Sequence, residues 1–320
     1  MRYFRFLTCL VFALISVTHC RIQAQTPSAA IRHYHEGEKR VKEGNWLAAM
    51  EEFTQAIELS SRPGGTRTSH YKDQPVVLGF TDAEPEADTI TIIDPFTARA
   101  YTNRCFVLYN LHEFERAIQD CNQALKISPG LAAAYLNRGA ARRAKKDLQE
   151  ALSDFDRALK IDPKSIEAYN DRGALRHDLG DTDGAIEDLN KAIALDDRLW
   201  VAYYHRGYAF LVKKDYDRAM QDFNRCIELQ PDFALAYQGR GTTFMDQTDF
   251  SRAINDFNRA LELDPQLDVA CMNRGLTFLL LGRDADAQKD FDRCLLLNPE
   301  AKEELEKRIQ LARELRSKKL

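Results

Sequence analysis

The apolar residues between positions 200 and 233 follow a helical period twice in succession. Tyr203, Gly207 and Phe210 are spaced i, i+4 and i+7, which places them on one face of a first helix. A polar stretch then interrupts the pattern before it resumes. We therefore expect a helix, a short turn and a second helix in this stretch.

The second helix shows the same spacing and a clear end. Ala219, Phe223 and Cys226 are again spaced i, i+4 and i+7, and Pro231 ends the helix because proline cannot continue one. Gly207 in the first helix and Ala219 in the second lack bulk, so the two helices can approach closely at these positions.

This unit recurs along the chain at a fixed spacing of 34 residues. An arginine, usually followed by glycine, marks each first helix, and an alanine followed three residues later by an aspartate marks each second helix. A fixed period of this size is typical of a stack of identical supersecondary units. The arginine ladder comprises Arg104, Arg138, Arg172, Arg206, Arg240 and Arg274, and the aspartate ladder comprises Asp120, Asp154, Asp188, Asp222, Asp256 and Asp290.

The repeated unit resembles the tetratricopeptide repeat. The aromatic–glycine–aromatic run of that family's first helix matches Tyr203, Gly207 and Phe210, and its alanine–aromatic–small–proline run matches the second helix. The resemblance implies an all-α solenoid of helix-turn-helix units that forms a right-handed superhelix and binds other proteins. It covers most of the chain, with units at 30–63, 98–131, 132–165, 166–199, 200–233, 234–267 and 268–301.

Several units depart from the pattern at single positions. Cys105 replaces the glycine of the second unit, and Arg142 and Arg176 replace the later aromatic residue of the first helix in the next two units. Asp197 stands in place of the proline of the fourth unit, and Cys271 in place of the first aromatic residue of the last. None of these changes breaks the helical period, so they concern local packing and not the fold.

Two segments lie outside the repeats. Residues 64–97 contain two short β-prone runs around an acidic, turn-forming stretch, which predicts an inserted loop or β-hairpin. Six carboxylates against Arg67 and Lys72 give this segment a charge of −4. A long loop of this kind is often functional, and a solvated insertion is the alternative. Residues 302–320 have a narrow apolar stripe among many charges and are expected to form a capping helix.

The two charged ladders are expected to be structural. Asp222 lies among the small packing positions of its helix, and Arg206 lies among the aromatic positions of the preceding helix. A charge in such a place requires a partner. We therefore predict an Arg–Asp bridge between adjacent helices, repeated along the array. The alternative is a row of exposed arginines that bind anions.

Another column of the first helix varies from unit to unit. In tetratricopeptide repeats this column lines the concave groove, and three of its positions here are asparagines with no obvious packing role. An asparagine amide both donates and accepts, so it can bind a peptide backbone of any sequence; ordinary solvated polar residues are the alternative. The residues predicted to bind a partner are Thr102, Asn103, Asn137, Asn170, Asp171, Tyr204, His205, Tyr208 and Asn273.

The N-terminal residues predict export. Two arginines precede an apolar run of about a dozen residues, which is typical of a secretory signal peptide and too short to span a bilayer. We expect a signal peptide over residues 1–24, with cleavage after Cys20 or Ala24. Lipid attachment to Cys20 is the alternative, although His19 stands where a bacterial lipobox has a small residue. Membrane association is expected only in that case.

Export would leave five cysteines in the mature chain. Cys105 with Cys121, and Cys271 with Cys294, lie within single helix pairs, so either pair could form a disulfide bond in an oxidising compartment. Cys226 occupies a small packing column. The alternative for all of these cysteines is a role as small, buried apolar residues.

The sequence carries no signature of catalysis or cofactor binding. It contains no HExxH, no G-x-S-x-G, no glycine-rich phosphate loop and no CxxC pair. A net charge of −4 without a basic stripe gives no indication of nucleic acid binding. We therefore predict a protein that is not an enzyme and that binds no cofactor, no metal, no nucleic acid and no small-molecule substrate.

Together these features predict an exported scaffold or adaptor, periplasmic or secreted, that binds a protein or extended peptide in its concave groove. One alternative is a structural assembly factor of a cell-envelope complex, which would use the convex faces and the array ends. A second alternative is a non-catalytic accessory subunit of a separate enzyme.

The mature protein should begin near residue 21 or residue 25, because a signal peptide is removed on export. N-terminal sequencing of the protein from its native host measures this directly. An intact Met1 in a soluble cytosolic fraction would contradict export, and a blocked, lipid-bearing Cys20 would favour the lipoprotein alternative.

Overall fold

The computed structural model describes residues 29–60 and 95–318, and every regular element in this part of the chain is a helix. The loop or β-hairpin predicted within 64–97 falls almost wholly outside the described residues and stays a prediction. Its last three residues belong to a helix, because α4 begins at Pro95.

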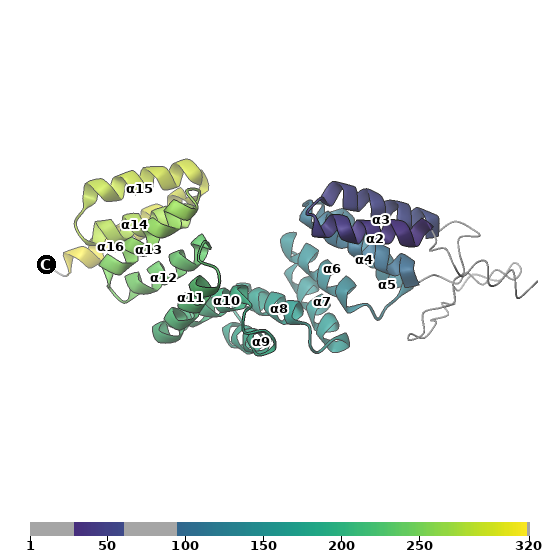
Figure 1. The fold of residues 1–320 in the computed structure, drawn as a ribbon. Coiled ribbons are helices and arrows are strands. Elements are labelled where there is room, and N and C mark those ends of the chain that lie inside the picture. The colour runs from purple at the N-terminus through teal and green to yellow at the C-terminus, as the bar shows by residue number, and fades with distance from the viewer. Residues whose placement is uncertain (1–28, 61–94, 319–320) are drawn as a thin grey trace, which may run out of the picture. The chain divides into compact units, whose positions relative to one another are not determined.

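The helices form pairs in sequence order, and a short turn joins the two members of each pair (Figure 1). A capping helix follows the last pair after a short 3-10 turn, η1. From the first repeat to the seventh, the pairs are α2 (Ala29–Lys42) with α3 (Trp46–Ser60), α4 (Pro95–Asn110) with α5 (Phe114–Ile127), α6 (Ala132–Ala144) with α7 (Leu148–Ile161), α8 (Ile166–Asp178) with α9 (Thr182–Leu195), α10 (Trp200–Val212) with α11 (Tyr216–Leu229), α12 (Ala234–Asp246) with α13 (Phe250–Leu263), and α14 (Asp268–Leu280) with α15 (Asp284–Leu297), followed by η1 (Pro299–Ala301) and α16 (Lys302–Ser317).

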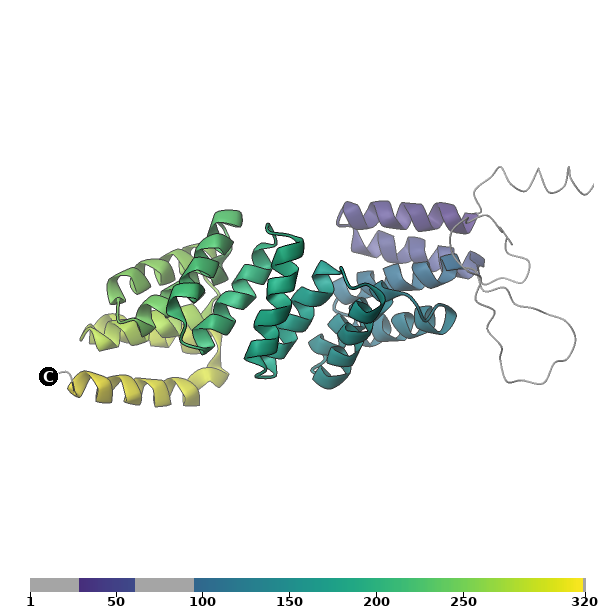
Figure 2. The ribbon, with the colours of Figure 1, turned by 90° about the horizontal axis from the view of Figure 1, so that it is seen from below.

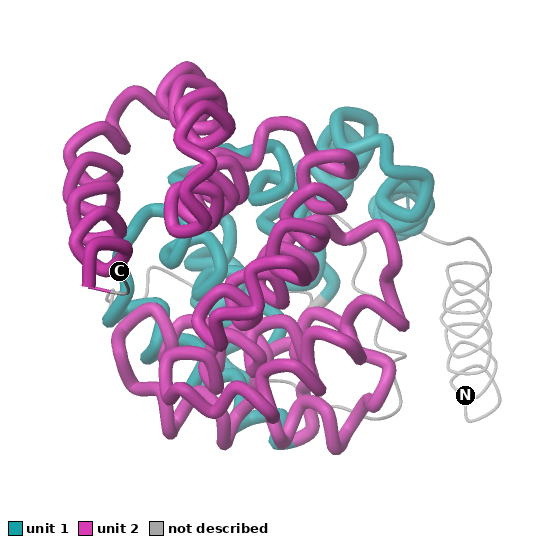
Figure 3. The backbone as a smooth tube through the Cα atoms, turned by 90° about the vertical axis from the view of Figure 1, so that its left-hand side faces the viewer, with its two compact units in different colours: residues 1–163 teal, residues 164–320 magenta. Residues whose placement is uncertain are grey.

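The chain divides into two compact units, residues 1–163 and 164–320 (Figure 3). The described part of unit 1 contains α2 to α7, and that of unit 2 contains α8 to α16. Within each unit, successive helices pack against one another, and the first helices of neighbouring repeats are also in contact (Figure 2). The all-α solenoid predicted from the sequence is therefore confirmed within each unit. Helix α16 packs against α14, as expected of a cap.

Phe223 shows how closely the helices approach. A Cβ atom on Gly207 of α10 would come within 2.9 Å of its ring, and a Cβ atom on Gly239 of α12 within 2.5 Å. Both distances are too short for non-bonded contact, so a side chain at either glycine would displace the ring. The close approach at Gly207 follows from the sequence pattern. Gly239 belongs to the column expected to line the groove, but it is buried and packs one repeat against the next.

A disulfide bond joins Cys105 of α4 to Cys121 of α5, with the two Cα atoms 5.6 Å apart. These cysteines occupy the columns of Gly207 and Phe223, so a covalent bond replaces the glycine–phenylalanine contact in the second repeat. Both cysteines are fully buried. The cysteines of the seventh repeat, which form the other pair suggested by the sequence, are buried thiols.

Each ladder arginine binds the aspartate of its own repeat through two hydrogen bonds. Arg206 in α10 donates from Nε and Nη2 to the two carboxylate oxygens of Asp222 in α11, at 2.8 and 2.7 Å. The same contact occurs in the other five pairs, so the predicted bridges are confirmed. Asp222 is only 3% exposed; burial raises its pKa, and the hydrogen bond from Arg206 opposes that rise.

A third polar residue, which the sequence analysis missed, joins this ladder. Arg206 also donates from Nη1 to Oδ1 of Asn190 at 2.6 Å, and Asn190 lies in α9 of the preceding repeat. The arginine therefore links the second helix of one repeat to both helices of the next. Equivalent contacts are Arg104 to Thr54, Arg138 to Asn122, Arg240 to Asn224 and Arg274 to Asn258.

Helices α6 and α8 carry a second arginine where the later first helices have an aromatic residue. Arg142 donates to Asp154 at 2.7 Å, and Arg176 donates to Asp188 at 2.8 Å, so each of these buried aspartates lies between two arginines. In α10, α12 and α14 the phenylalanine at this position instead lies beneath an arginine near the start of the second helix, 4.3 to 4.4 Å from the ring centroid. Both arrangements fill the same corner of the repeat.

Replacing Arg206 by Ala should lower the free energy of unfolding by roughly 3–5 kcal/mol, because buried Asp222 loses its charged partner. The folded-state pKa of Asp222 then lies further above its unfolded value, and the folded state binds an extra proton between the two values. Stability in that window rises as the pH falls. The deficit of Arg206→Ala should therefore be smaller near about pH 5 than near about pH 7, as measured by urea unfolding.

Lys213→Ala is the matched control for this variant. Lys213 pairs with Asp183 on the surface, and such an exposed pair contributes at most about 1 kcal/mol. Equal losses in the two variants would show that the ladder arginines are solvated and do not hold the fold.

The double variant Cys105→Gly/Cys121→Phe should fold without the disulfide, because it restores the glycine–phenylalanine packing of the neighbouring repeats. The unsubstituted protein should lose about 2–4 kcal/mol of stability on reduction, whereas the double variant should unfold at the same midpoint with and without dithiothreitol. Thermal unfolding under both conditions measures this. An unsubstituted protein that is insensitive to reductant would contradict a stabilising role for the disulfide.

Candidate partner-binding surface

The predicted binding residues lie on one face of the first helices, the first-helix face, which is defined by Thr102 and Asn103 in α4 and by the equivalent positions of the other first helices. Asn103 donates from Nδ2 to the hydroxyl oxygen of Tyr34 in α2, at 3.1 Å. Asn137 in α6 donates to the backbone carbonyl oxygen of Thr102 at 3.2 Å. Each amide therefore ties its helix to the preceding first helix.

Asn273 makes the same kind of contact in unit 2 and is buried. It donates to Oγ1 of Thr242 in α12 at 3.1 Å, and its Oδ1 accepts from Arg308 of the capping helix at 3.1 Å. Only 3% of Asn273 is exposed. The expectation that the asparagines have no packing role is therefore wrong, because all three amides hold neighbouring helices together.

Two further predicted residues are buried in packing positions. Thr102 is 5% exposed, and its hydroxyl donates to the carbonyl oxygen of Ala98 at 2.9 Å. Asn170 is 8% exposed and donates to Oδ1 of Asp171 at 3.1 Å. A partner therefore has little access to Thr102 and Asn170 in this structure, whereas Asp171 is partly exposed.

The predicted aromatic residues of α10 form a continuous, partly exposed cluster. The ring of Tyr204 lies 5.1 Å from those of both His205 and Tyr208, in edge-on geometry. Burial raises the pKa of Tyr204 to about 12 and also raises the pKa of Tyr208. The Tyr208 hydroxyl accepts a hydrogen bond from Gln238 of α12 at 3.2 Å. Both tyrosines are therefore neutral at physiological pH and present aromatic surface.

Three exposed apolar side chains on the first-helix face escaped the sequence analysis. Phe106 in α4 is 38% exposed, Val212 in α10 is 61% exposed and Val269 in α14 is 39% exposed. Each lies three or four residues from a predicted binding residue of its own helix, which places it on the same face. That spacing is the signal by which they could have been found.

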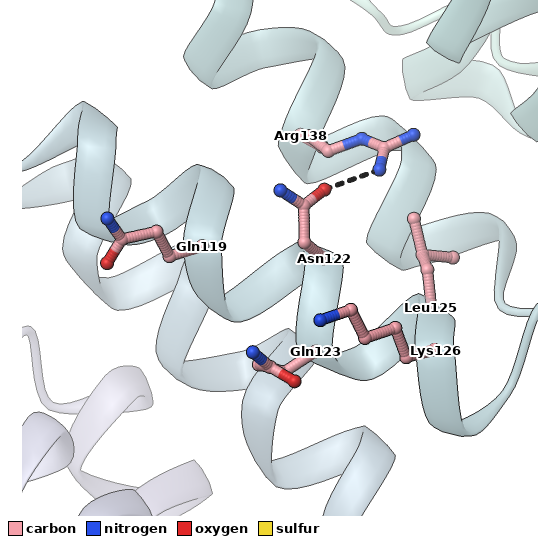
Figure 4. Close-up of a pocket in the computed structure, with 6 residues that line it drawn as sticks. All are labelled: Gln119, Asn122, Gln123, Leu125, Lys126 and Arg138. Carbon is pink, nitrogen blue, oxygen red and sulfur yellow. Dashed lines mark hydrogen bonds between the residues drawn. The ribbon is translucent and has the colours of Figure 1, made fainter. Parts of the chain in front are cut away.

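Two shallow pockets lie elsewhere, in unit 1. The first, of about 400 Å³, is lined by residues of α5 and by Arg138 of α6, which donates to Asn122 (Figure 4). The second, of about 420 Å³, is formed by α6 and α7 and shares Arg138 with the first. Neither contains a residue that the sequence analysis assigned to the groove, so these two pockets and the predicted binding residues do not coincide.

Within residues 29–60 and 95–318, no group of three or more His, Cys, Asp or Glu side chains is arranged to hold a metal ion. No helix in the same described ranges combines the length and the apolar character needed to cross a membrane.

Several solved structures of other proteins resemble this chain in fold. A tetratricopeptide repeat protein from Parabacteroides merdae is 18% identical with a TM-score of 0.60, over 89% of this chain and 98% of its own. PilW, a type IV pilus biogenesis factor, is 21% identical with a TM-score of 0.58, over 63% and 94%. A chain of the Cut9–Hcn1 complex of APC/C is 13% identical with a TM-score of 0.62, over 87% and 54%. At these identities the likeness shows the fold alone.

The repeats of this chain match models of a known protein family. No curated protein sequence matches the chain. Models described as tetratricopeptide repeat match residues 98–131, 138–202, 200–233, 234–267 and 269–301, which together make up more than half of the sequence. With helix pairs in every matched range, the chain belongs to the tetratricopeptide repeat family.

Proposed function

We propose that this protein is a non-catalytic scaffold or adaptor that binds a partner protein, or an extended peptide of it, on the first-helix face. The main support for the proposal is that some positions of the repeats are constant and others vary. The Arg–Asp bridge recurs in six of them, whereas the first-helix face differs in each. At the position of Asn103, the partly exposed residues are Asn137, Asp171 and His205 in the next three repeats.

Variation of this kind has a physical meaning. Residues that pack identical helices can be identical, and the ladders show that they are. A partly exposed face whose charge and polarity change between repeats carries information that a partner can recognise. Exposed apolar side chains at Phe106, Val212 and Val269 supply surface whose burial would favour association.

Export is part of the proposal, and two features support it. The N-terminal segment has the composition of a signal peptide, although residues 1–28 are not described by the structure. The disulfide between Cys105 and Cys121 is typical of oxidising compartments, since cytosolic thiols are kept reduced. A periplasmic or secreted location agrees with both.

Substituting Asp for Val212 or Val269 should weaken partner binding by about tenfold or more, because each change puts a charge into apolar contact surface. The unfolding midpoint should change little, since both side chains are exposed. The partner would first be captured by crosslinking in the native cell and identified by mass spectrometry. Its affinity for the purified variants would then be measured by calorimetry.

Matched controls exist on the second helices. Leu47 in α3 is 62% exposed and Leu296 in α15 is 82% exposed, so Leu47→Asp and Leu296→Asp test for a general effect of surface charge. Asparagine variants are less suitable, because the amides hold neighbouring helices together. Binding that survives both valine variants but is lost in a control, or on deletion of residues 66–94, would contradict the proposal.

A further inference from the structure

The second pocket of unit 1, between α6 and α7, has an excess of positive charge. Four cationic side chains and two carboxylates line it. One carboxylate, Asp154, is buried and accepts hydrogen bonds from Arg138 and Arg142. The other two cations, Arg157 and Lys160, are exposed. The second carboxylate, Asp156, is exposed as well. Two cations and one carboxylate of the pocket are therefore accessible to the solvent or to a ligand, and the positive charge stays in excess.

Arg157 lies near an aromatic ring. Its guanidinium group lies over the ring of Tyr135, 5.9 Å from the centroid, and Arg138 lies 5.3 Å from the same centroid. A cation that stacks on an aromatic ring keeps its hydrogen-bond donors available at the edge of the guanidinium plane. The exposed guanidinium of Arg157 can therefore still bind a carboxylate through two hydrogen bonds.

The fifth and sixth repeats differ from the third at this position. Arg225 and Arg259 occupy the position of Arg157 in the fifth and sixth repeats, and each donates to a glutamate three residues further on, at 3.1 and 3.2 Å. Those glutamates, Glu228 and Glu262, are replaced by lysine in the third repeat. Within the ranges that the structure describes, Arg157 has no carboxylate partner.

The same replacement occurs one repeat earlier. Lys126 occupies the equivalent position in α5 and lines the first pocket, beside Gln119, Asn122 and Gln123 (Figure 4). The two pockets share Arg138. They therefore form one strip of hydrogen-bond donors and cations along two repeats, which we name the outer strip.

We propose that the outer strip binds a carboxylate-rich peptide segment of a partner protein. Arginine and amide donors match carboxylates, and a shallow strip that crosses two repeats suits an extended chain better than an enclosed small molecule. The chain as a whole has a net charge of −4, so an acidic partner would be attracted to this strip and not to the protein surface in general. The strip is separate from the first-helix face, which gives the scaffold a second binding surface.

A labelled peptide of alternating glutamate and alanine is the probe, and fluorescence anisotropy at low ionic strength is the measurement. The full chain should bind it, and added salt should weaken the binding. Lys160→Glu should reduce the affinity by about tenfold or more, because it gives Arg157 the carboxylate that the fifth and sixth repeats provide. Circular dichroism should show an unchanged fold, since glutamate is native at this position in α11 and α13.

The reverse substitution is the matched variant. Glu228→Lys removes the acid that neutralises Arg225, so it should create a second site of the same kind in the fifth repeat. Calorimetry should then show more peptide bound per chain than in the unsubstituted protein. Val212→Asp should leave binding of this probe unchanged, so failure of the first-helix proposal and failure of this one are distinguishable.

Four outcomes would overturn the proposal. Equal affinity of the unsubstituted protein and Lys160→Glu would show that the strip does not bind the probe. Displacement of the peptide by an equal concentration of inorganic phosphate would indicate a small-anion site, and tighter binding of single-stranded RNA with the same dependence on Lys160 would indicate a nucleic acid site. The chain also contains an acidic segment of its own, which the quadruple variant Asp82→Asn, Glu84→Gln, Glu86→Gln and Asp88→Asn neutralises. If this variant binds the probe more tightly than the unsubstituted protein, the acidic segment is the occupant of the strip.

Discussion

The fold of each unit depends on a guanidinium group that binds three helices at once. Arg206 holds the carboxylate of Asp222 in its own repeat and the amide oxygen of Asn190 in the repeat before it. A bidentate charge-assisted pair is among the stronger polar contacts in proteins, and its planar geometry fixes both distance and direction. Because Asp222 is almost fully buried, the pair cannot be opened at low cost, and the three helices keep their relative positions.

These arginine contacts allow other packing positions of a repeat to vary. The corner occupied by Phe210 in the fifth repeat is filled by Arg176 in the fourth, which adds a second guanidinium to the buried Asp188. In the second repeat, a disulfide replaces glycine and phenylalanine at the closest point of contact. A repeat is stabilised mainly by its own contacts and those to its neighbours, so one such exchange need not disturb the rest of the array.

The sequence predicts the Arg–Asp bridges well because the residues that form them are close in sequence and recur at a fixed spacing. A charge among packing positions needs a partner, so the Arg–Asp bridges follow from two ladders with one spacing. Asn190, Asn224 and Asn258 recur with the same spacing and could have been included by the same argument. The sequence offered two possible disulfides, each within one helix pair. The choice between the second and the seventh repeat needed the geometry of the two cysteines in each pair.

The candidate surfaces were predicted less well, because exposure is a tertiary property. Asn273 and Asn103 share a column, yet the capping helix covers Asn273 through Arg308 while Asn103 stays partly exposed. No periodicity in a single column contains that information. The outer strip is indicated in a different way, by a residue that differs in charge from the residues at the same position of other repeats. Lys160 stands where the fifth and sixth repeats have a glutamate that pairs with their arginine, and packing alone gives no reason for this reversal of charge at an exposed position.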